Sequence, residues 1–379
     1  MSALTLTVFL PLAAWLYLLL GRGAFWRARE RDDSEQIPEL SHWPAVTAVV
    51  PARNEADVIA QSIGSLLAQN YPGTFRIVLV DDQSDDGTGG IVRALGESGK
   101  LDVIRGATRP HGWTGKLWAM SQGAECAAGN APDYFWFTDA DIAHVPDNLR
   151  RLVARAGHHN LALTSLMVKL SCINPAERFF IPAFVYFFRM LYPFAWVNDP
   201  KSRTAAAAGG CMLVNRAALE RAGGLGAIRN ALIDDCALGK LMKRHGTVWL
   251  GLTERALSIR PYENMNAIRR MVTRSAYAQL NYSPLLLAGT LAGLLVVFVA
   301  PVLFALLGMG VARLAGIAAL LIMVASFVPM LRFYGRSPLW AFALPAIGLL
   351  YTVFTLDSAV QYWRGRGGMW KGRAQAMIR

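Results

Sequence analysis

Residues 76–90 read RIVLVDDQSDDGTGG, an apolar run that stops abruptly in a cluster of acidic and turn-forming residues. A short, β-branched apolar run bounded by turn residues is typical of a buried strand. A similar run covers 46–50 and ends at Pro51. Along the neighbouring sequence, apolar residues recur at helical spacing between such runs. We therefore predict strands at 46–50, 76–80, 102–104 and 134–138, and helices at 55–68, 91–95 and 116–128.

This alternation of strands and helices predicts an α/β fold, in which a parallel sheet is covered by helices on both faces. In Rossmann-like sheets of this kind, ligands bind at the carboxyl ends of the strands. The acidic residues at 81–86 and 139–141 follow two of the predicted strands. We therefore expect a binding site at that edge of the sheet.

An apolar run at 4–20 precedes the α/β region and contains no charged residue, whereas arginines follow it up to Arg31. Basic residues placed after the run, rather than before it, favour a signal-anchor helix within 1–24 over a cleavable signal peptide. Its N-terminus would lie outside the membrane. A buried core helix is the alternative interpretation.

A second apolar region, 284–362, follows the α/β region. Its three segments, 284–307, 311–330 and 339–360, each have about the length of a membrane span. Three spans would place the basic tail, 363–379, on the side opposite the catalytic domain, against the positive-inside tendency. As an alternative, one of these three segments is re-entrant or lies in the membrane interface instead of spanning the bilayer. We predict a cytoplasmic catalytic domain at 40–282, in which the aromatic stretch 175–198 is either an interfacial helix or a core helix.

The charge distribution and the cysteines narrow the class of protein further. The formal net charge is +12, and the basic residues cluster beside the apolar segments, which favours an anionic lipid surface over a nucleic acid. The four cysteines lack C-x-x-C spacing, which argues against zinc and against a disulfide framework. Both observations agree with a multi-pass protein of the bacterial-type inner membrane whose catalytic domain faces the cytoplasm.

The cluster at 81–88 contains acidic residues at the end of a predicted strand. An Asp at this place can accept hydrogen bonds from a nucleobase N–H or a ribose hydroxyl. The Ser, Asp and Gly residues that follow equally favour a tight turn that opens the next helix. Binding and turn formation both remain open for this cluster.

Asp139 and Asp141 directly follow the strand predicted at 134–138. Two carboxylates separated by one residue can approach the same divalent cation. Diphosphate oxygens and water then complete the oxygen shell that Mg²⁺ or Mn²⁺ prefers. Such an ion offsets the charge that develops on a leaving nucleoside diphosphate.

Three further elements have both a functional and a structural interpretation. Asp234 and Asp235 precede an apolar, helix-like run, where they either provide a general base or cap the helix. Lys116 follows a glycine at a predicted helix start, where it is either a phosphate contact or a solvated surface lysine. The small residues at 205–211 allow either a close approach of the backbone to a ligand or tight packing.

In this order, PARNE at 51–55, DD at 81–82, WTGK at 113–116, DAD at 139–141 and DD at 234–235 resemble the GT-A-fold glycosyltransferases of families 2 and 21. The likeness runs from about residue 44 to the C-terminus. Within these families, the chain is most similar to the ceramide-glucosyltransferase-like group and to glycosyltransferases associated with hopanoid biosynthesis. The resemblance implies a UDP-sugar donor, a divalent cation and a lipid acceptor in hopanoid or glycolipid biosynthesis.

The resemblance also implies residue roles. Asp82 would hold the uridine, Asp139 and Asp141 would bind the metal, and Asp235 would be the base of an inverting transfer. The implied catalytic set is Asp235, Asp234 and Arg274, and the implied nucleotide-sugar contacts are Pro51, Arg53, Asn54, Glu55, Asp81, Asp82, Asp85, Lys116 and Asp139.

The chain departs from the family pattern in two places. Family members usually carry Gln or Arg, then two residues, then Arg-Trp, whereas this chain has Met271 and Ser275 around Arg274. Asp234 stands where Glu is common. Two other functions therefore stay open: a membrane-anchored nucleotidyltransferase of related fold, and a catalytically degenerate membrane protein.

Overall fold

The computed structural model describes residues 8–95, 99–366, 369–370 and 373–374. The chain divides into two compact units. The sheet unit comprises Glu30–Ser171, Trp196–Pro261 and the C-terminal segment from Met369, and the helical unit comprises Met1–Arg29, Cys172–Ala195 and Tyr262–Gly368.

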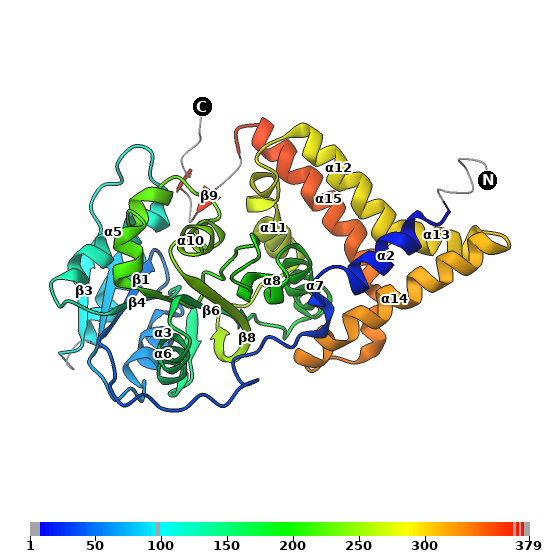
Figure 1. Cartoon of the computed structure of the whole chain (residues 1–379). Coiled ribbons are helices and arrows are strands. Elements are labelled where there is room, and N and C mark those ends of the chain that lie inside the picture. Colours follow the sequence, from blue (N-terminus) through cyan, green and yellow to red (C-terminus); the bar gives the residue numbers. More distant parts are fainter. Residues whose placement is uncertain (1–7, 96–98, 367–368, 371–372, 375–379) are drawn as a thin grey trace. The chain divides into compact units, whose positions relative to one another are not determined.

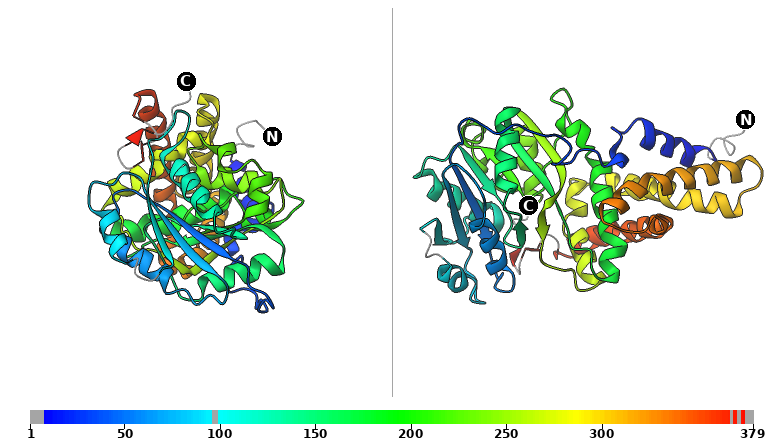
Figure 2. Two further views of the ribbon diagram at one scale, coloured as in Figure 1. Left: turned by 90° about the vertical axis from the view of Figure 1, so that its left-hand side faces the viewer. Right: turned by 90° about the horizontal axis from the view of Figure 1, so that it is seen from below.

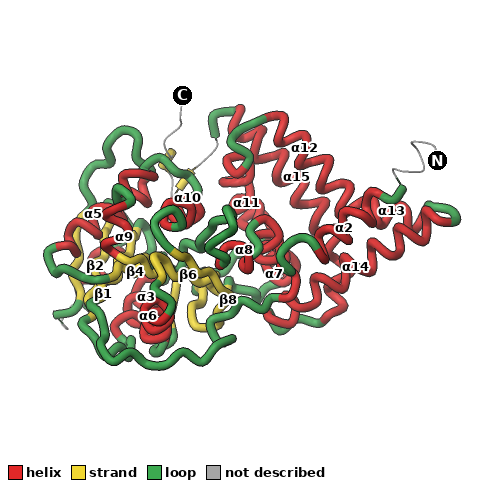
Figure 3. The backbone as a smooth tube through the Cα atoms, viewed as in Figure 1, coloured by secondary structure: helices red, strands yellow, loops and turns green. Residues whose placement is uncertain are grey.

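The sheet unit is built on an eight-stranded sheet with the order β3-β2-β1-β4-β7-β6-β8-β5 (Figures 1 and 3). Strands β3, β2, β1 and β4 are parallel, β7 is antiparallel to both of its neighbours, β6 and β8 are parallel, and β5 is antiparallel to β8. The strands are β1 Val46–Ala52, β2 Phe75–Asp81, β3 Leu101–Arg105, β4 Tyr134–Phe137, β5 Ile142–His144, β6 Leu161–Lys169, β7 Met212–Asn215 and β8 Thr247–Ser258. A separate pair joins β9 Met369–Trp370 to β10 Arg373–Ala374.

Helices cover both faces of this sheet, with α3 and α6 on one face and α5 on the other (Figures 1 and 2). Every residue of β1 is buried, as expected for a central parallel strand. Helix α5 lies close to β1 and β2 because Gly123 has no side chain: a Cβ there would lie 2.4 Å from a Val49 methyl. The helices of the unit are α3 Ile59–Leu67, α4 Thr88–Ala94, α5 Gly115–Ala128, α6 Asn148–His158, α9 Arg216–Arg221, η3 Leu225–Ile228 and α10 Asp234–Met242.

The predicted α/β fold is confirmed, and each predicted strand and helix up to 138 has a counterpart. The helix predicted at 55–68 begins only at Ile59, because the residues before it form a turn. In that turn, the Ala56 N–H donates to Asp86 and the Glu55 N–H donates to Thr88. Asp86 and Thr88 lie after the neighbouring strand, so no local pattern could indicate this later start.

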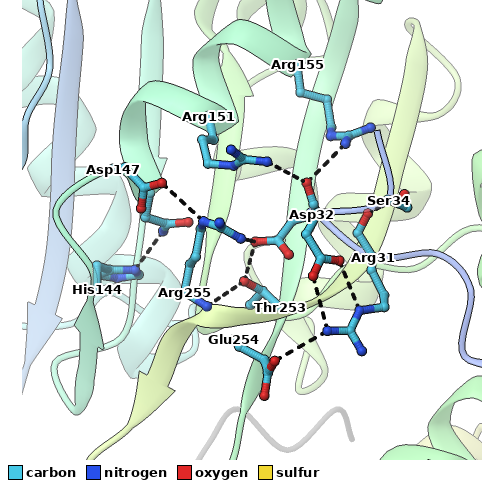
Figure 4. A network of polar contacts seen from close by, with 12 residues as sticks. Arg31, Asp32, Ser34, His144, Asp147, Arg151, Arg155, Thr253, Glu254 and Arg255 are labelled. Carbon is cyan, nitrogen blue, oxygen red and sulfur yellow. Dashed lines mark hydrogen bonds and ion pairs between the residues drawn. The ribbon is translucent and has the colours of Figure 1, made fainter. Parts of the chain in front are cut away.

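A strap at 31–39 crosses α6 and β8 and is held by ion pairs (Figure 4). Asp32 accepts hydrogen bonds from Thr253 at 2.6 Å and from Arg255 at 3.3 Å, and its backbone carbonyl accepts from Arg151 and Arg155. Backbone bonds between the strap and Leu252 add to this attachment. A cavity of about 250 Å³ lies beside the strap, lined by arginines of α6, acidic residues and two tryptophans.

The helical unit contains three helical stretches that are long and apolar enough to cross a membrane: Pro284–Leu307, Val311–Phe333 and Pro338–Trp363. They correspond closely to the three predicted segments. Helix α2, Leu10–Leu20, is shorter, and the first residues of the predicted anchor lie outside the described part of the chain. Most of the predicted basic tail also lies outside it. The elements are α2, η1 Phe25–Arg27, α7 Pro175–Leu191, α11 Met265–Gln279, α12 Pro284–Leu294, η4 Leu295–Val299, α13 Ala300–Leu307, α14 Val311–Phe333, η5 Pro338–Ala343 and α15 Leu344–Trp363, while α8 Phe194–Asn198 spans the boundary between the units.

Helices α7 and α11 both belong to the helical unit, although the domain predicted at 40–282 includes them. A capping box formed by Asn174 and Glu177 starts α7. The Tyr186 hydroxyl then lies 2.7 Å from Ser326 of α14. Nine of the 17 residues of α7 are buried, and the interfacial and core interpretations of this stretch both stay predictions.

Candidate active site

The polar residues singled out in the sequence lie mainly at one edge of the sheet unit, at the carboxyl ends of β1, β2 and β4. Asn54 and Glu55 follow β1, Asp81 and Asp82 lie at the end of β2, and Asp139 and Asp141 follow β4. Lys116 is in the first turn of α5, and Asp234 with Asp235 forms the first turn of α10. This is the edge at which parallel α/β sheets bind ligands.

Several acidic residues of the 81–88 cluster build a turn. Asp81 accepts a hydrogen bond from the Ser84 N–H at 2.9 Å, and Asp86 accepts from the N–H and hydroxyl of Thr88. The Asp85 N–H donates to Asn54, which ties the turn to the residues after β1. The turn interpretation of this cluster is therefore realised at Asp81 and Asp86.

Asp82 occupies a different environment from its neighbours. Its side chain is almost completely buried, and its backbone carbonyl accepts a hydrogen bond from Arg53 at 2.6 Å. The chain after β3 passes close by, since a Cβ on Gly106 would lie 3.5 Å from an Asp82 carboxylate oxygen. Asp82 is thus packed closely between the chain segments that follow β1 and β3, and its role toward uridine stays a prediction.

Lys116 occupies the centre of the candidate site. Thr114 caps α5 by accepting a hydrogen bond from the Leu117 N–H, which places Lys116 in the first turn. The Lys116 Nζ lies 2.8 Å from Asp139 and 3.1 Å from Asp234. Burial alone would lower the pKa of Lys116, but attraction to these two carboxylates outweighs it and raises the pKa. The alternative of a solvated surface lysine is therefore wrong, because only 15% of the side chain is exposed.

Asp235, in the first turn of α10, also belongs to the candidate site. Its carboxylate accepts hydrogen bonds from the Gly209 N–H at 3.0 Å and from the Cys236 N–H at 2.7 Å. Burial, followed by the charge on Asp234, raises the pKa of Asp235 to about 6, although Lys116 opposes the shift. Ile233 occupies the N-cap position, and both acids lie in the first turn of α10. The hydrogen bond from the Cys236 N–H to Asp235 also stabilises the helix start, so the base and helix-start interpretations both remain open.

The small residues at 205–211 serve both packing and the site. A Cβ on Gly239 of α10 would lie 2.5 Å from the Ala206 backbone, so tight packing requires a glycine there. A Cβ on Gly209 would instead lie 3.2 Å from the Lys116 Nζ and 3.5 Å from Asp235. Gly209 therefore keeps the space beside the lysine and the acid open.

Arg260, which follows β8, belongs to the site although no sequence motif singled it out. Its guanidinium pairs with Glu55, lies 2.7 Å from Asp57, and approaches Asp141 to 3.8 Å. Burial, then the charges on Asp139 and Glu55, raise the pKa of Asp141 to about 6, and Arg260 opposes this shift. A lone arginine far along the chain has no local pattern, so only the fold could reveal it.

Asp139 and Asp141 fit a divalent ion that also binds substrate. Their side chains are 34% and 29% exposed, so their oxygens are accessible from the solvent side. Among the described residues, no three His, Cys, Asp or Glu side chains converge to form a complete metal cage. Mg²⁺ is commonly held by one or two carboxylates together with substrate phosphates, and this pair provides such a partial site.

Arg274, the remaining predicted site residue, lies on α11 in the helical unit. Contacts with α15 hold this helix: Arg269 pairs with Asp357 at 2.8 Å, and the Tyr277 N–H donates to Ser358. Arg274 is thus on a helix docked against a candidate membrane span, and its catalytic role stays a prediction.

Comparisons with known proteins identify similar sequences. Residues 47–223 match the family model "Glycosyl transferase family 2". The succinoglycan biosynthesis protein ExoO of Rhizobium meliloti is 34% identical over 119 residues, and the probable glycosyltransferase YdaM of Bacillus subtilis is 29% identical over 119 residues. Each alignment covers 31% of this chain, and the chain spans only 32% and 28% of the lengths of these relatives.

A solved structure shares the fold. The mannosyltransferase PcManGT from Pyrobaculum calidifontis, in complex with GDP-Man and Mn²⁺, aligns with a TM-score of 0.55 and 19% identity. The alignment covers 95% of this chain and 99% of that protein. Residues 47–223 are therefore similar to the family 2 glycosyl transferases, and the sheet to which they belong has a GT-A-like α/β fold.

Proposed function

We propose that this protein is an inverting glycosyltransferase that moves a sugar from a UDP-sugar to a lipid acceptor at the cytoplasmic face of a membrane. The observation that carries this proposal is the convergence of Lys116, Asp139, Asp234 and Asp235 at the carboxyl edge of the sheet. The arrangement places a cation, a candidate metal ligand and a buried acid together. Transfer from a nucleotide sugar can use the two positive charges to stabilise the leaving diphosphate and the acid to accept a proton.

Asp235 is our candidate for the general base. Its hydrogen bonds to the Gly209 and Cys236 amides fix the orientation of the carboxylate, and its raised pKa makes it a better proton acceptor. In an inverting transfer, this carboxylate takes the proton of the acceptor hydroxyl while that oxygen attacks the sugar carbon. The bond to the nucleoside diphosphate breaks in the same step.

Lys116 is our candidate contact for the diphosphate. Asp139 and Asp234 hold the ammonium group in place, so its positive charge is already oriented before the donor diphosphate binds. A divalent ion bound between Asp139 and Asp141 would supply further positive charge to the leaving diphosphate. PcManGT carries GDP-Man and Mn²⁺, which supports this reading of the paired acids, whereas our choice of uridine rests on the family resemblance.

A lipid acceptor is proposed because apolar helices flank the transferase domain in the sequence. Side chains such as Leu285, Leu307 and Met309 are more than 70% exposed in the helical unit, which is unfavourable in water and favourable in a bilayer. Hopanoid, ceramide-like and polyprenyl lipids all fit such an acceptor. We propose an inner-membrane location with the catalytic domain in the cytoplasm.

The acceptor can be tested by incubating membranes that contain the protein with labelled UDP-sugars and Mn²⁺ and then extracting the lipids. The proposal predicts label in the lipid fraction, and none from membranes that contain Asp235→Asn. Label found only on a soluble acceptor would refute the lipid assignment. The membrane-anchored nucleotidyltransferase is tested by a separate incubation with a nucleoside triphosphate and a sugar phosphate, in which it would form a nucleotide sugar and release pyrophosphate.

A catalytically degenerate membrane protein is the second alternative, motivated by Met271 and Ser275. It predicts that a cellular phenotype of the wild-type gene is rescued equally well by Asp141→Ala and Asp235→Asn. Loss of rescue by either variant would exclude this alternative.

A further inference from the structure

Arg260 is a charged residue of the candidate site that the proposed reaction leaves without a role. It approaches three acidic residues that come from different parts of the chain: Glu55 and Asp57 after β1, and Asp141 after β4. An arginine guanidinium is protonated throughout the neutral pH range, so this side chain stays charged. A permanent positive charge therefore lies beside one of the two candidate metal ligands.

The contacts of Arg260 differ in kind. Its two terminal nitrogens are engaged by Glu55 and Asp57 through hydrogen bonds. Its Nε, in contrast, is buried without a hydrogen-bond partner among the described residues and lies 3.8 Å from Asp141. Arg260 thus acts on Asp141 through charge alone, and this arginine does not occupy the lone pairs with which Asp141 would bind an ion.

Lys116 completes the pattern, because it pairs with Asp139 at 2.8 Å. In the donor-free site, each carboxylate of the Asp139–Asp141 pair is therefore next to a protein cation. A divalent ion that enters alone meets two nearby positive charges, which weaken its binding. A diphosphate that arrives with the ion adds negative charge and relieves this repulsion.

We propose that Arg260 is a positioning residue that keeps the affinity of the Asp139–Asp141 pair for a divalent ion low until the donor diphosphate arrives. The inference rests on the proposed function, since it assumes that the two acids hold the ion of a nucleotide sugar. Its consequence is that metal and donor bind cooperatively rather than in a fixed order. By linkage, each strengthens the binding of the other by the same factor.

The test is Mn²⁺ binding to the purified full-length protein, followed by electron paramagnetic resonance with and without UDP. Wild type should bind Mn²⁺ weakly alone and at least about tenfold more tightly with UDP. Arg260→Gln should bind Mn²⁺ alone about tenfold more tightly than wild type and show correspondingly less gain from UDP. Arg260→Lys, which keeps the charge, should resemble wild type.

Arg255→Gln is the matched control, because Arg255 lies on β8 and also bridges two carboxylates, Asp32 and Asp147, away from the metal pair (Figure 4). It should leave Mn²⁺ binding unchanged. Unfolding temperatures of all variants report whether each protein is folded. The wild-type comparison with and without UDP needs no variant, so the inference stays testable if Arg260→Gln does not fold.

Three results would overturn the inference: equal Mn²⁺ affinity of wild type with and without UDP, unchanged or weaker binding by Arg260→Gln, or no Mn²⁺ binding by any form. Nucleotide release from UDP-sugars, measured on membranes that contain the same proteins and supply the lipid acceptor, separates these failures from a failure of the proposed function. Release by wild type together with any of the three results refutes only the role of Arg260. Absence of release from every donor refutes the transferase itself.

Discussion

Replacing Asp235 by Asn should separate stability from catalysis. The substitution keeps the size of the side chain and one oxygen that accepts the hydrogen bond from the Gly209 N–H, but it removes the charge and the proton-accepting ability. Loss of a general base typically lowers the rate by about 10²–10⁴-fold. We therefore expect kcat to fall by this factor while donor binding changes little.

The structure also gives a magnitude for stability. A pKa of about 6 instead of 3.8 means that ionised Asp235 destabilises the fold by roughly 3 kcal/mol at neutral pH. The side-chain amide introduced by Asp235→Asn would lose the hydrogen bond from the Cys236 N–H, which costs about 1 kcal/mol. The variant should therefore be more stable by about 1–2 kcal/mol at pH 8.

The sign of the pH effect provides the control. Because the folded pKa of Asp235 is raised, its unfavourable contribution is fully present above about pH 6 and disappears as the pH falls toward 3.8. The stability advantage of Asp235→Asn should thus shrink between pH 8 and pH 5, as measured by thermal unfolding in one detergent. Lower stability at pH 8 together with lost donor binding would refute the reasoning, since Asp235 would then be a structural residue.

Three further predictions concern the same site. Lys116→Met removes the cation that Asp139 and Asp234 share. It should therefore lower the free energy of unfolding by about 3 kcal/mol in thermal unfolding and weaken UDP binding in calorimetry. If both the stability and the UDP affinity were unchanged, Lys116 would have no role in holding the two acids or in binding the donor. Transfer by wild type should decline as the pH falls below about 6, because Asp235 then carries a proton, and a flat rate profile from pH 7 to pH 5 would argue against a general base. Gly209→Ala should raise KM for the donor several-fold, because the new methyl group would lie 3.2 Å from the Lys116 ammonium. Gly64→Ala is the control and should leave KM unchanged, because a methyl group there meets no atom within 4 Å. Equal KM values for the two variants would show that a methyl group at position 209 does not crowd the site.

Much of the fold could be predicted from the sequence, because buried strands and helices leave local periodic patterns. The strands predicted around 46–50 and 76–80 extend by one or two residues in the structure, and the three apolar segments match the long helices. Exact helix starts were harder to predict. The helix predicted from residue 55 begins at Ile59, because hydrogen bonds from another loop hold the preceding turn.

The candidate site could be predicted less completely. The positions of Asp139 and Lys116 at strand and helix ends were apparent, but their ion pair joins different elements and has no sequence pattern. The same reason explains why Arg260 was missed: its three acidic partners are brought together only by the fold. Local propensity also suggested a helix cap at Asp234 and Asp235, whereas the structure uses Ile233 at that position.

The decisive experiment measures metal-dependent release of nucleoside diphosphate from a panel of nucleotide sugars by membranes that supply the lipid acceptor and contain either wild type or Asp235→Asn. We expect release by wild type from at least one UDP-sugar, loss of this release on chelation of the metal, and a decrease of at least about 10²-fold in the variant. Equal release by the two proteins would contradict the account, because the carboxylate at the start of α10 would then take no part in the transfer.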